Sequence, residues 1–413
     1  MTEEKNNIFD ILEERGYIEQ ITDIDQVKEM FSKKSVPFYI GIDPTADSLH
    51  IGHFVSVIVA SRMQKAGHKP IILVGGGTAQ IGDPSGKSDM RKMLSKEDIE
   101  HNIAGIKKQL EKFLSFEGDN ACIIVNNGDW INDLNYLDFM KTIGVHFNVN
   151  KMLAADAYKQ RMANGGLTFF EMGYMLLQSY DFLKLYEEYG CKLELGGNDQ
   201  WSNIIGGVNL IRKLGHADAY GLTFKLLLTK EGKKMGKTEK GALWLDPEKT
   251  SPYDFYQYWR NISDEDVENV MKLLTDIPVE KIKEYTLDIH DAEKINEAKR
   301  VTAFEITKLI HGEEEAIKAE EAAKALFSGA GNTDNMPSTE IKDAIGKSIL
   351  DILVELGITS SKGQGKQLIA QGGITLNDEK VSDVGYKMQE SDFTNNEAII
   401  KKGKKVFHKI VKM

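Results

Sequence analysis

Residues 36–77 read VPFYIGIDPTADSLHIGHFVSVIVASRMQKAGHKPIILVGGG, and this stretch decides the fold. The runs Val36 to Ile42 and Pro70 to Val74 are apolar and have the length of buried strands. Residues 51–66 between them repeat apolar side chains at helical spacing. A strand, a helix and a second strand in this order predict two parallel strands joined by a crossover helix.

The same alternation continues toward residue 245. Further strands are expected at Ala121 to Val125 and Lys192 to Leu195, and further helices at residues 95–114 and 167–189. The prediction is an α/β fold whose parallel sheet is covered by helices on both faces. Such sheets bind ligands beyond the carboxyl ends of their strands. Three segments follow expected strands at that edge: Gly41-Ile42-Asp43-Pro44-Thr45, Gly75-Gly76-Gly77 and Gly196-Gly197-Asn198-Asp199-Gln200.

The chain has 413 residues, more than one hydrophobic core usually holds, so several domains are expected. We expect an α/β domain at 1–248, a helical domain at 249–327, a linker at 328–340 and a small α+β module at 341–413.

No apolar run has the length of a membrane span, and the polar, acidic start lacks the features of a secretion signal. A cytoplasmic protein without a membrane partner is therefore expected.

Charge and cysteine content exclude several classes of protein. A formal net charge of -11 argues against indiscriminate nucleic-acid binding, which depends on Lys and Arg. From Ile341 to Met413, however, 12 Lys face 9 acidic residues, so any nucleic acid is expected to meet this tail or a local patch.

Cys122 and Cys191 stand alone in apolar runs, which is typical of buried hydrophobic side chains and not of a zinc site or a disulfide framework.

The first motif is His50-Ile51-Gly52-His53, at the start of the helix expected over residues 51–66. Free backbone N–H groups and the helix dipole favour an anion at such a position. Gly52 leaves room for a flat ring against the backbone. The alternatives are two surface histidines, or a metal pair for which the sequence offers no third ligand nearby, so no protein metal site is expected.

Gly82-Asp83-Pro84-Ser85-Gly86-Lys87-Ser88 resembles a phosphate-binding P-loop only in part. It has three residues between its glycines where that loop needs four, and Ile81 stands where the first glycine is required. Lys87 and Arg91, four residues apart, are still expected to be able to face one anion together.

Residues 167–189 predict a buried helix that is apolar almost all round, including Phe169 and Phe170. Tyr174, Gln178 and Asp181 form one polar stripe on it, at i, i+4 and i+7. A buried carboxylate requires a partner, which is either a polar ligand or an internal network that ties this helix to its neighbour.

Residues 230–241 contain five lysines and three glycines, including Lys234-Met235-Gly236-Lys237-Thr238. Most runs of this kind are solvated loops. Glycine hinges with lysines three apart also describe a mobile lid that brings cations onto developing phosphate charge.

Together these motifs resemble the bacterial-type tyrosyl-tRNA synthetases of aminoacyl-tRNA synthetase class I. His50-Ile51-Gly52-His53 is similar to the HIGH motif of the class, and Lys234-Met235-Gly236-Lys237-Thr238 to a glycine-bearing KMSKS loop. The segments around Tyr39, Asp83, Tyr174 and Asp199 occur in the family's order, and the likeness covers nearly the whole chain. Asn198 departs from the serine that is common at its position.

The resemblance implies a Rossmann-like catalytic domain, a helical anticodon-region domain and a small RNA-binding tail. It also implies a homodimer with its interface near residues 130–165. The implied substrates are L-tyrosine, ATP and tRNA(Tyr), with Mg²⁺ on the phosphates. The residues implied to bind tyrosine are Tyr39, Asp83, Tyr174, Gln178, Asp181 and Gln200. Those implied to face adenosine or ATP are Gly41, Asp43, Gly52, Gly197, Asp199 and Lys237. Those implied to surround the reacting triphosphate are Thr45, His50, His53, Lys87, Arg91, Lys234, Lys237 and Thr238.

The chemistry of these groups is consistent with carboxylate attack on ATP. The tyrosine carboxylate is already an anion, so activation needs orientation and cations more than a general base. A tryptophan-specific relative is the closest alternative, although Tyr39 with Asp181 favours a phenol over an indole. A P-loop kinase or ATPase and a non-catalytic RNA-binding protein are the more distant alternatives.

Overall fold

A computed structural model describes residues 7–33, 35–85, 94–215, 217–238, 241–328, 338–377, 379–403 and 406–412. The chain divides into two compact units. The first unit comprises residues 1–237, 242–246 and 263–295. The second comprises residues 238–241, 247–262 and 296–413.

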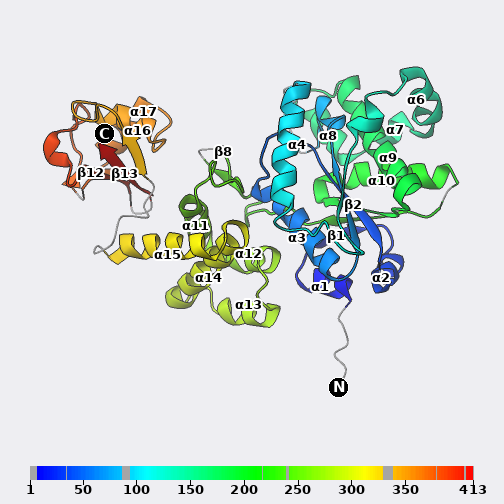
Figure 1. The fold of residues 1–413 in the computed structure, drawn as a ribbon, viewed down its shortest axis with the longest axis horizontal. Coiled ribbons are helices and arrows are strands. Elements are labelled where there is room, and N and C mark those ends of the chain that lie inside the picture. The colour runs from blue at the N-terminus through cyan, green and yellow to red at the C-terminus, as the bar shows by residue number, and fades with distance from the viewer. Residues whose placement is uncertain are drawn as a thin grey trace. The chain divides into compact units, whose positions relative to one another are not determined.

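The first unit is built on a six-stranded sheet with the order β1-β6-β5-β2-β3-β4. Figure 1 labels β1 and β2 of this sheet and the helices around it. All neighbours are parallel except β1, which pairs antiparallel with β6. The strands are β1 (Ile18–Ile21), β2 (Pro37–Ile42), β3 (Lys69–Val74), β4 (Ile123–Asn126), β5 (Leu193–Gly197) and β6 (Tyr220–Phe224). The four expected strands are confirmed, and β1 and β6 extend the sheet on the β5 side.

Both faces of the sheet are covered, as expected. Tyr39 and Ile71 are buried against the cluster formed by α9 and α10, and Phe38 and Ile72, which alternate with them, are equally buried. The Rossmann-like parallel sheet is therefore confirmed.

The helices before the long α9 in the first unit are α1 (Ile8–Glu14), α2 (Ile24–Ser32), α3 (Ile51–Lys65), α4 (Lys96–Leu110), α5 (Gly128–Ile131), α6 (Tyr136–Thr142), α7 (Val149–Leu153) and α8 (Asp156–Ala163). Those from α9 onward are α9 (Phe169–Tyr189), α10 (Trp201–Lys213), α12 (Val267–Leu274) and α13 (Val279–Tyr285). Two short strands, β7 (Lys237–Thr238) and β8 (Gly241–Ala242), lie in the lysine-rich segment. The three helices expected from the apolar spacing correspond to α3, α4 and α9.

α9 shows how local signals set the ends of an element. Thr168 and Glu171 form a reciprocal capping box at its start, and Gly190 ends it with a left-handed φ of 65°. The expectation that this helix is apolar and buried all round is wrong at its first turn. Phe169 is 67% exposed and Phe170 is 45% exposed, whereas Phe182 is fully buried.

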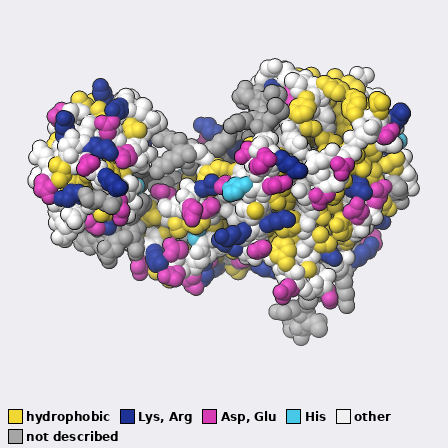
Figure 2. Space-filling model, turned by 45° about the horizontal axis from the view of Figure 1, so that its top comes forward, with side chains coloured by type: hydrophobic (Ala, Val, Ile, Leu, Met, Phe, Trp, Pro, Cys, Tyr) yellow, Lys and Arg dark blue, Asp and Glu magenta, His cyan; other side chains and the backbone are white. Residues whose placement is uncertain are grey.

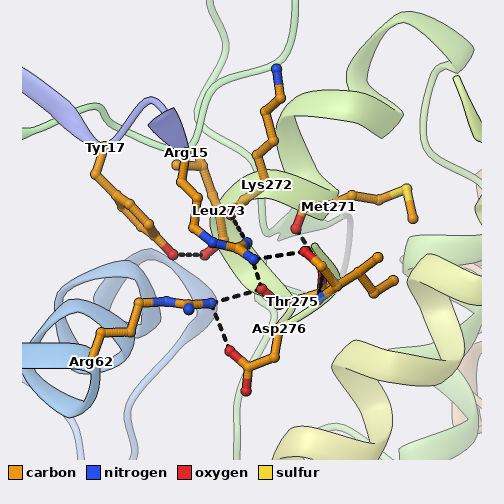
Figure 3. Close-up of polar contacts among 9 residues, drawn as sticks. Arg15, Tyr17, Arg62, Met271, Lys272, Leu273, Thr275 and Asp276 are labelled. Atoms are coloured by element: carbon orange, nitrogen blue, oxygen red, sulfur yellow. Dashed lines mark hydrogen bonds and ion pairs between the residues drawn. The ribbon is translucent and has the colours of Figure 1, made fainter. Parts of the chain in front are cut away.

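The carboxyl end of α12 is held by side chains from distant segments of the first unit (Figure 3). Arg15 donates to the carbonyl oxygens of Lys272 and Thr275 at 2.9 Å each and to that of Ile277 at 2.6 Å. These bonds place guanidinium charge at the negative end of the helix dipole and satisfy carbonyls that have no partner within the helix.

Two further side chains complete this cap. The hydroxyl of Tyr17 donates to the carbonyl oxygen of Leu273. Arg62, in the last turn of α3, donates to the carbonyl oxygen of Thr275 and forms an ion pair with Asp276, both at 2.7 Å. The segment 263–295 therefore packs with the α/β unit, although the composition of the sequence groups it with the helices on either side.

The second unit contains α11 (Pro252–Arg260), α15 (Glu313–Ser328) and most of α14 (Ala292–His311). Its C-terminal module contains α16 (Ile349–Glu355), α17 (Lys362–Ala370) and a five-stranded sheet in the order β11-β10-β12-β13-β9. Those strands are β9 (Ser338–Ile341), β10 (Ile374–Leu376), β11 (Glu379–Lys380), β12 (Glu397–Lys402) and β13 (Val406–Lys412). The module has its own apolar core, which includes Ile352, Leu353, Ile374 and Ile400. This confirms the small α+β tail.

Candidate active site

The carboxyl ends of β2, β3 and β5 bring the expected site residues to one edge of the sheet. Asp43 follows β2, the glycines 75–77 follow β3, and Asn198 to Gln200 form a short 3-10 turn after β5. Parallel pairing of the strands brings these segments together, because Ile42 lies opposite Val74 and Tyr39 lies opposite Glu194. The motifs therefore gather because the strands run in the same direction.

A hydrogen-bond chain links Asp43 to Asp181. The hydroxyl of Tyr174 donates to Asp43 Oδ2 and that of Thr78 to Asp43 Oδ1, both at 2.8 Å. The amide of Asn127 donates to Thr78 Oγ1 at 3.0 Å and to Asp181 Oδ2 at 2.9 Å. Asp43, implied by the resemblance to face adenosine, is thus bonded in this structure to a residue implied to bind tyrosine.

Gly75 is required for this arrangement. A Cβ atom at Gly75 would lie 2.0 Å from Asp43 Oδ1 and 2.4 Å from Thr78 Oγ1, closer than any side chain tolerates. The glycine-rich turn after β3 therefore lets the Asp43 carboxylate approach the backbone of the neighbouring strand end.

Asp181 is 1% exposed and accepts a second hydrogen bond, from Trp130 Nε1 to Oδ1 at 2.7 Å. Burial raises the pKa of Asp181 well above its usual range, and the donors on Asn127 and Trp130 oppose that shift. Of the two readings of the polar stripe, the internal network is present: Asn127 and Trp130 tie α9 to the segment after β4. The Asp181 carboxylate has further lone pairs, so it can also accept a hydrogen bond from a ligand.

Glu194 is a buried carboxyl group beside Tyr39, at 2% exposed. Tyr39 Oη lies 2.5 Å from Glu194 Oε1, and the amide of Gln178 donates to the same oxygen at 2.9 Å. Burial raises the pKa of Glu194 to about 7 and raises that of Tyr39 well above its usual value. Sequence reasoning missed Glu194, although a carboxylate inside the apolar run after Cys191 was a signal.

Asp83 and Gln200 meet at the same edge. Gln200 Nε2 donates to Asp83 Oδ2 at 2.7 Å, and Asn203 donates to Gln200 Oε1 at 3.0 Å. Asp83 is 6% exposed and also accepts from the backbone N–H of Ser85, so its carboxylate is held in a defined position. Two of the residues implied to bind tyrosine are therefore in direct contact.

The two histidines stand at the start of α3, as expected. His50 is the N-cap, and its Nδ1 accepts from the backbone N–H of Gly52 at 3.0 Å. The rings of His50 and His53 stack with centroids 3.8 Å apart. A Cβ atom at Gly52 would lie 2.8 Å from His50 Cε1, so in this structure the flat ring against Gly52 is that of His50.

The second motif lies against the first, within the first unit. The backbone N–H of Ile51 donates to Leu243 at 3.0 Å, and that of Leu243 donates to Gly236 at 2.7 Å. Gly236 has a φ of 79°, and a Cβ atom there would lie 2.1 Å from the Ile51 side chain. Gly236 and Ile51 are 185 residues apart in the chain, and only glycine allows the two motifs to approach this closely.

Lys234 reaches the end of β5. Its Nζ lies 3.0 Å from Asp199 Oδ2, and both side chains are partly exposed. Met235 between the two motif lysines is buried and anchors the segment. This places a cation of the second motif beside a carboxylate implied to face adenosine.

Some implied residues fall outside the described part of the chain. Lys87 and Arg91 lie within residues 86–93, which the structure does not describe. For Lys237 and Thr238 the backbone forms β7, and their side chains are not described. The roles of these four residues stay predictions.

Comparison with known proteins identifies the family. The model described as "tRNA synthetases class I (W and Y)" matches residues 31–328, and the "Tyrosine-tRNA ligase SYY-like C-terminal domain" matches residues 330–410. The tyrosine-tRNA ligase of Clostridium perfringens is 56% identical over 406 residues, covering 98% of this chain and 99% of the relative. The chain belongs to the bacterial-type tyrosine-tRNA ligases.

Other relatives agree with this placement. The tyrosine-tRNA ligase of Acetivibrio thermocellus is 56% identical over 98% of this chain and 99% of its own length. The crystal structure of a C-terminally truncated Aspergillus nidulans mitochondrial tyrosyl-tRNA synthetase has a TM-score of 0.69 at 28% identity, covering 78% of this chain and 95% of that one. A tryptophanyl-tRNA synthetase from Encephalitozoon cuniculi, at 14% identity, shares the fold with a TM-score of 0.55.

This ligase activates L-tyrosine with ATP to tyrosyl-adenylate and pyrophosphate, and then transfers the tyrosyl group to the 3′ end of tRNA. Its near-complete likeness to tyrosine enzymes decides against the tryptophan-specific alternative and the P-loop alternative. None of the helices in the described ranges is long and apolar enough to cross a membrane.

Proposed function

We propose that the buried polar groups between β2, β5 and α9 form the tyrosine pocket of this ligase. Tyr39 and Asp181 would contact the phenol hydroxyl, and Asp83, Tyr174 and Gln178 the ammonium group, with Gln200 beside the carboxylate. The observation that supports this most strongly is the burial of Tyr39 and Asp181, at 1% exposed each, on the sheet face that α9 covers. Burying polar groups of this kind is costly unless a ligand or a network completes their hydrogen bonds.

We also propose that ATP lies across the start of α3. His50, His53 and Thr45 would meet the phosphates there, together with Lys87, Arg91, Lys237 and Thr238. Gly41, Asp43, Gly52, Gly197 and Asp199 would face the nucleoside. The contact of Gly236 with Ile51 supports this, because it holds the lysine-rich segment at the anion-binding end of α3.

The ion pair between Lys234 and Asp199 suggests how the site changes when ATP binds. Lys234 forms an ion pair with the Asp199 carboxylate, and the triphosphate would draw Lys234 away to the leaving pyrophosphate. Orientation and positive charge are the main requirements of this reaction. Lys234 would therefore act on the activation step more than on tyrosine binding.

Mg²⁺ is proposed to arrive with the ATP phosphates. In the described ranges no three His, Cys, Asp or Glu side chains are grouped to hold a metal ion, and Mg²⁺ commonly keeps its water and substrate phosphate ligands. The metal would add charge neutralisation at the phosphates, while the protein supplies orientation through the groups above.

A homodimer is proposed, with an interface near residues 130–165. Large apolar side chains are exposed over α6, α7 and the start of α9, and Figure 2 shows hydrophobic side chains gathered on the upper right of the first unit. Exposed patches of this extent are typical of protein interfaces. The exposed residues are Tyr136, Leu137, Val145, Val149, Met162, Phe169 and Phe170.

The domain roles and the cellular location are also proposals. Residues 249–327 would meet the anticodon region of tRNA(Tyr), and 341–413 would bind RNA through a surface rich in lysine, with 328–340 as a linker between them. Residues 1–248 would carry the chemistry. A cytoplasmic location is proposed from the substrates.

Tyrosine-dependent ATP-pyrophosphate exchange tests the proposed pocket. We expect Asp181→Ala to raise the KM for tyrosine strongly with little effect on the KM for ATP. Glu188→Gln, an exposed change on the same helix, serves as the control. An Asp181→Ala enzyme that used tyrosine like the wild type would place the pocket elsewhere.

A further inference from the structure

Glu194 carries a polar atom that the proposed pocket leaves unexplained. Its Oε2 is buried without a hydrogen-bond partner, and so is Oε1 of Gln178. A Cβ atom at Gly207 of α10 would lie 3.4 Å from Glu194 Oε2. This oxygen therefore faces the backbone of α10 at a glycine, which has no side chain to donate a hydrogen bond. A buried carboxylate oxygen without a donor is costly, and protonation of the carboxyl group removes most of that cost.

The groups around Glu194 define its electrostatic surroundings. Tyr39 faces it from β2, Gln178 and Asp181 from α9, and the thiol of Cys191 from the residues before β5. None of these supplies positive charge. Each carboxyl group has two donors in the structure, but both donors to Asp181 are N–H groups, which cannot accept a proton in return, whereas the Tyr39 hydroxyl beside Glu194 can turn from donor to acceptor. The added proton is therefore better placed on Glu194 than on Asp181.

The direction of the Tyr39 hydrogen bond follows from that proton. When Glu194 is ionised, the Tyr39 hydroxyl donates to it and offers the pocket only lone pairs. Asp181 is also an acceptor, so a substrate phenol with one proton meets two acceptors. When Glu194 is neutral, its O–H donates to Tyr39 Oη, and the Tyr39 proton is free to point at the substrate. The phenol then accepts from Tyr39 and donates to Asp181.

We propose that Glu194 is a specificity-determining residue that binds a proton when tyrosine binds and thereby makes Tyr39 a hydrogen-bond donor to the substrate phenol. The proton comes from solvent, and no bond other than this O–H is made or broken. The inference rests on the proposed tyrosine pocket. Its physical basis is the 2.5 Å contact between Tyr39 and Glu194 together with the unpartnered Oε2.

The sign of the pH dependence follows directly. Tyrosine binds the neutral form better, so its affinity falls as pH rises through the pKa of Glu194, which burial raises to about 7. If only the neutral form binds, the dissociation constant for tyrosine rises roughly 30-fold between about pH 6 and about pH 8.5. Proton uptake on binding is largest at the upper end of this range.

Isothermal titration calorimetry of the whole enzyme with L-tyrosine tests the proposal. Titrations at several pH values, each in two buffers of different ionisation enthalpy, measure the dissociation constant and the protons taken up. The key variant is Glu194→Gln, which is close in shape to the neutral carboxyl group and does not titrate. We expect this variant to bind tyrosine as the wild type does at low pH, with no pH dependence and no proton uptake in this range.

Controls separate this role from a structural one. Glu188→Gln should retain the wild-type pH profile. Tyr39→Phe keeps the titrating carboxyl group but removes the hydroxyl that couples it to the substrate, so it should bind tyrosine weakly at every pH, and it remains informative if Glu194→Gln does not fold.

Two outcomes distinguish this inference from the pocket assignment. If wild type and Glu194→Gln show the same pH profile and the same proton uptake, the proposed role of Glu194 is wrong. The pocket assignment still stands in that case if Asp181→Ala weakens tyrosine binding. Unchanged tyrosine binding in Asp181→Ala would overturn the pocket assignment itself.

Discussion

At the scale of single residues, the site combines groups that the sequence singled out with groups that it did not. Gln178 and Asp181 were predicted from their spacing and from the family likeness, and Tyr39 from the family likeness alone. Their hydrogen-bond partners Asn127 and Glu194 were not, because Asn127 lies in a polar turn after β4 and Glu194 lies in an apolar run, and each becomes a partner only after the strands pair. The polar stripe of α9 therefore has a double role, as a tie to the neighbouring segment and as the proposed wall of the pocket.

Asp181→Ala removes the acceptor for the phenol and leaves Asn127 and Trp130 with unpaired N–H groups. Loss of a hydrogen bond to a charged group costs about 1.5–3 kcal/mol, which corresponds to roughly a 10- to 150-fold rise in the dissociation constant for tyrosine. Equilibrium dialysis with labelled tyrosine measures this dissociation constant. Selectivity over phenylalanine should fall in parallel, because the family rejects phenylalanine through groups that a hydroxyl must pair; unchanged selectivity would argue against this role.

Lys234→Ala should slow tyrosine-dependent ATP-pyrophosphate exchange by roughly 100-fold, the usual scale for losing one positioned electrostatic group. Tyrosine binding should stay unchanged, because Lys234 contacts Asp199 and none of the buried residues around Tyr39. Lys233→Ala, at the exposed neighbouring position, is the matched control. A similar loss in tyrosine binding would show that the lysine-rich segment also shapes the tyrosine pocket.

At the scale of elements, α12 connects the two halves of the proposed ATP site. Its start is fastened to the lysine-rich segment, because the backbone N–H of Lys230 donates to Asp266 Oδ1 at 2.8 Å. Its carboxyl end is capped by Arg15 and by Arg62, which lies in the last turn of α3 (Figure 3). One short helix thus links the base of the lysine-rich segment to the helix that opens with His50.

Arg15→Ala should lower the free energy of unfolding by about 3 kcal/mol, because it leaves buried carbonyl oxygens at the end of α12 without donors. Thermal and urea unfolding followed by circular dichroism measure the loss. Lys28→Ala, which breaks an exposed ion pair with Asp10, should change stability by less than about 1 kcal/mol. Equal effects of the two variants would mean that the cap of α12 contributes little.

At the scale of the whole molecule, exposed apolar surface is the feature that a single chain does not explain. It gathers over α6, α7 and the first turn of α9, where the sequence predicted that Phe169 and Phe170 would be buried. Both side chains lie in the first turn of α9, whose start is fixed by the capping box of Thr168 and Glu171. In the proposed homodimer, a second copy of the chain would cover this apolar surface.

The double variant Leu137→Asp and Val145→Asp should convert the dimer to a monomer in sedimentation equilibrium, because it places charge where apolar surfaces would meet. Both side chains are more than half exposed, so the fold of the monomer should survive. Leu287→Asp changes an isolated leucine that is even more exposed and should leave the dimer intact. A wild-type mass equal to one 46.3 kDa chain would refute the dimer directly.

The amino-acid sequence by itself determined the α/β alternation, the ends of α3 and α9, and the two motifs, because helical spacing, capping residues and glycines act over a few residues. Strand limits were predicted to within about two residues, as with Ala121 to Val125 against Ile123–Asn126. The edge strand β1 was not predicted, since four residues of mixed polarity become a strand only by pairing with β6.

Only the tertiary structure decided which distant residues meet. The contact of Gly236 with Ile51, the cap on α12 and the pairing of Tyr39 with Glu194 join segments between 155 and more than 250 residues apart. No local pattern encodes such distances, because strand order and register are set by burial of the whole sheet. The same burial turned an ordinary glutamate at position 194 into a carboxyl group with a pKa of about 7.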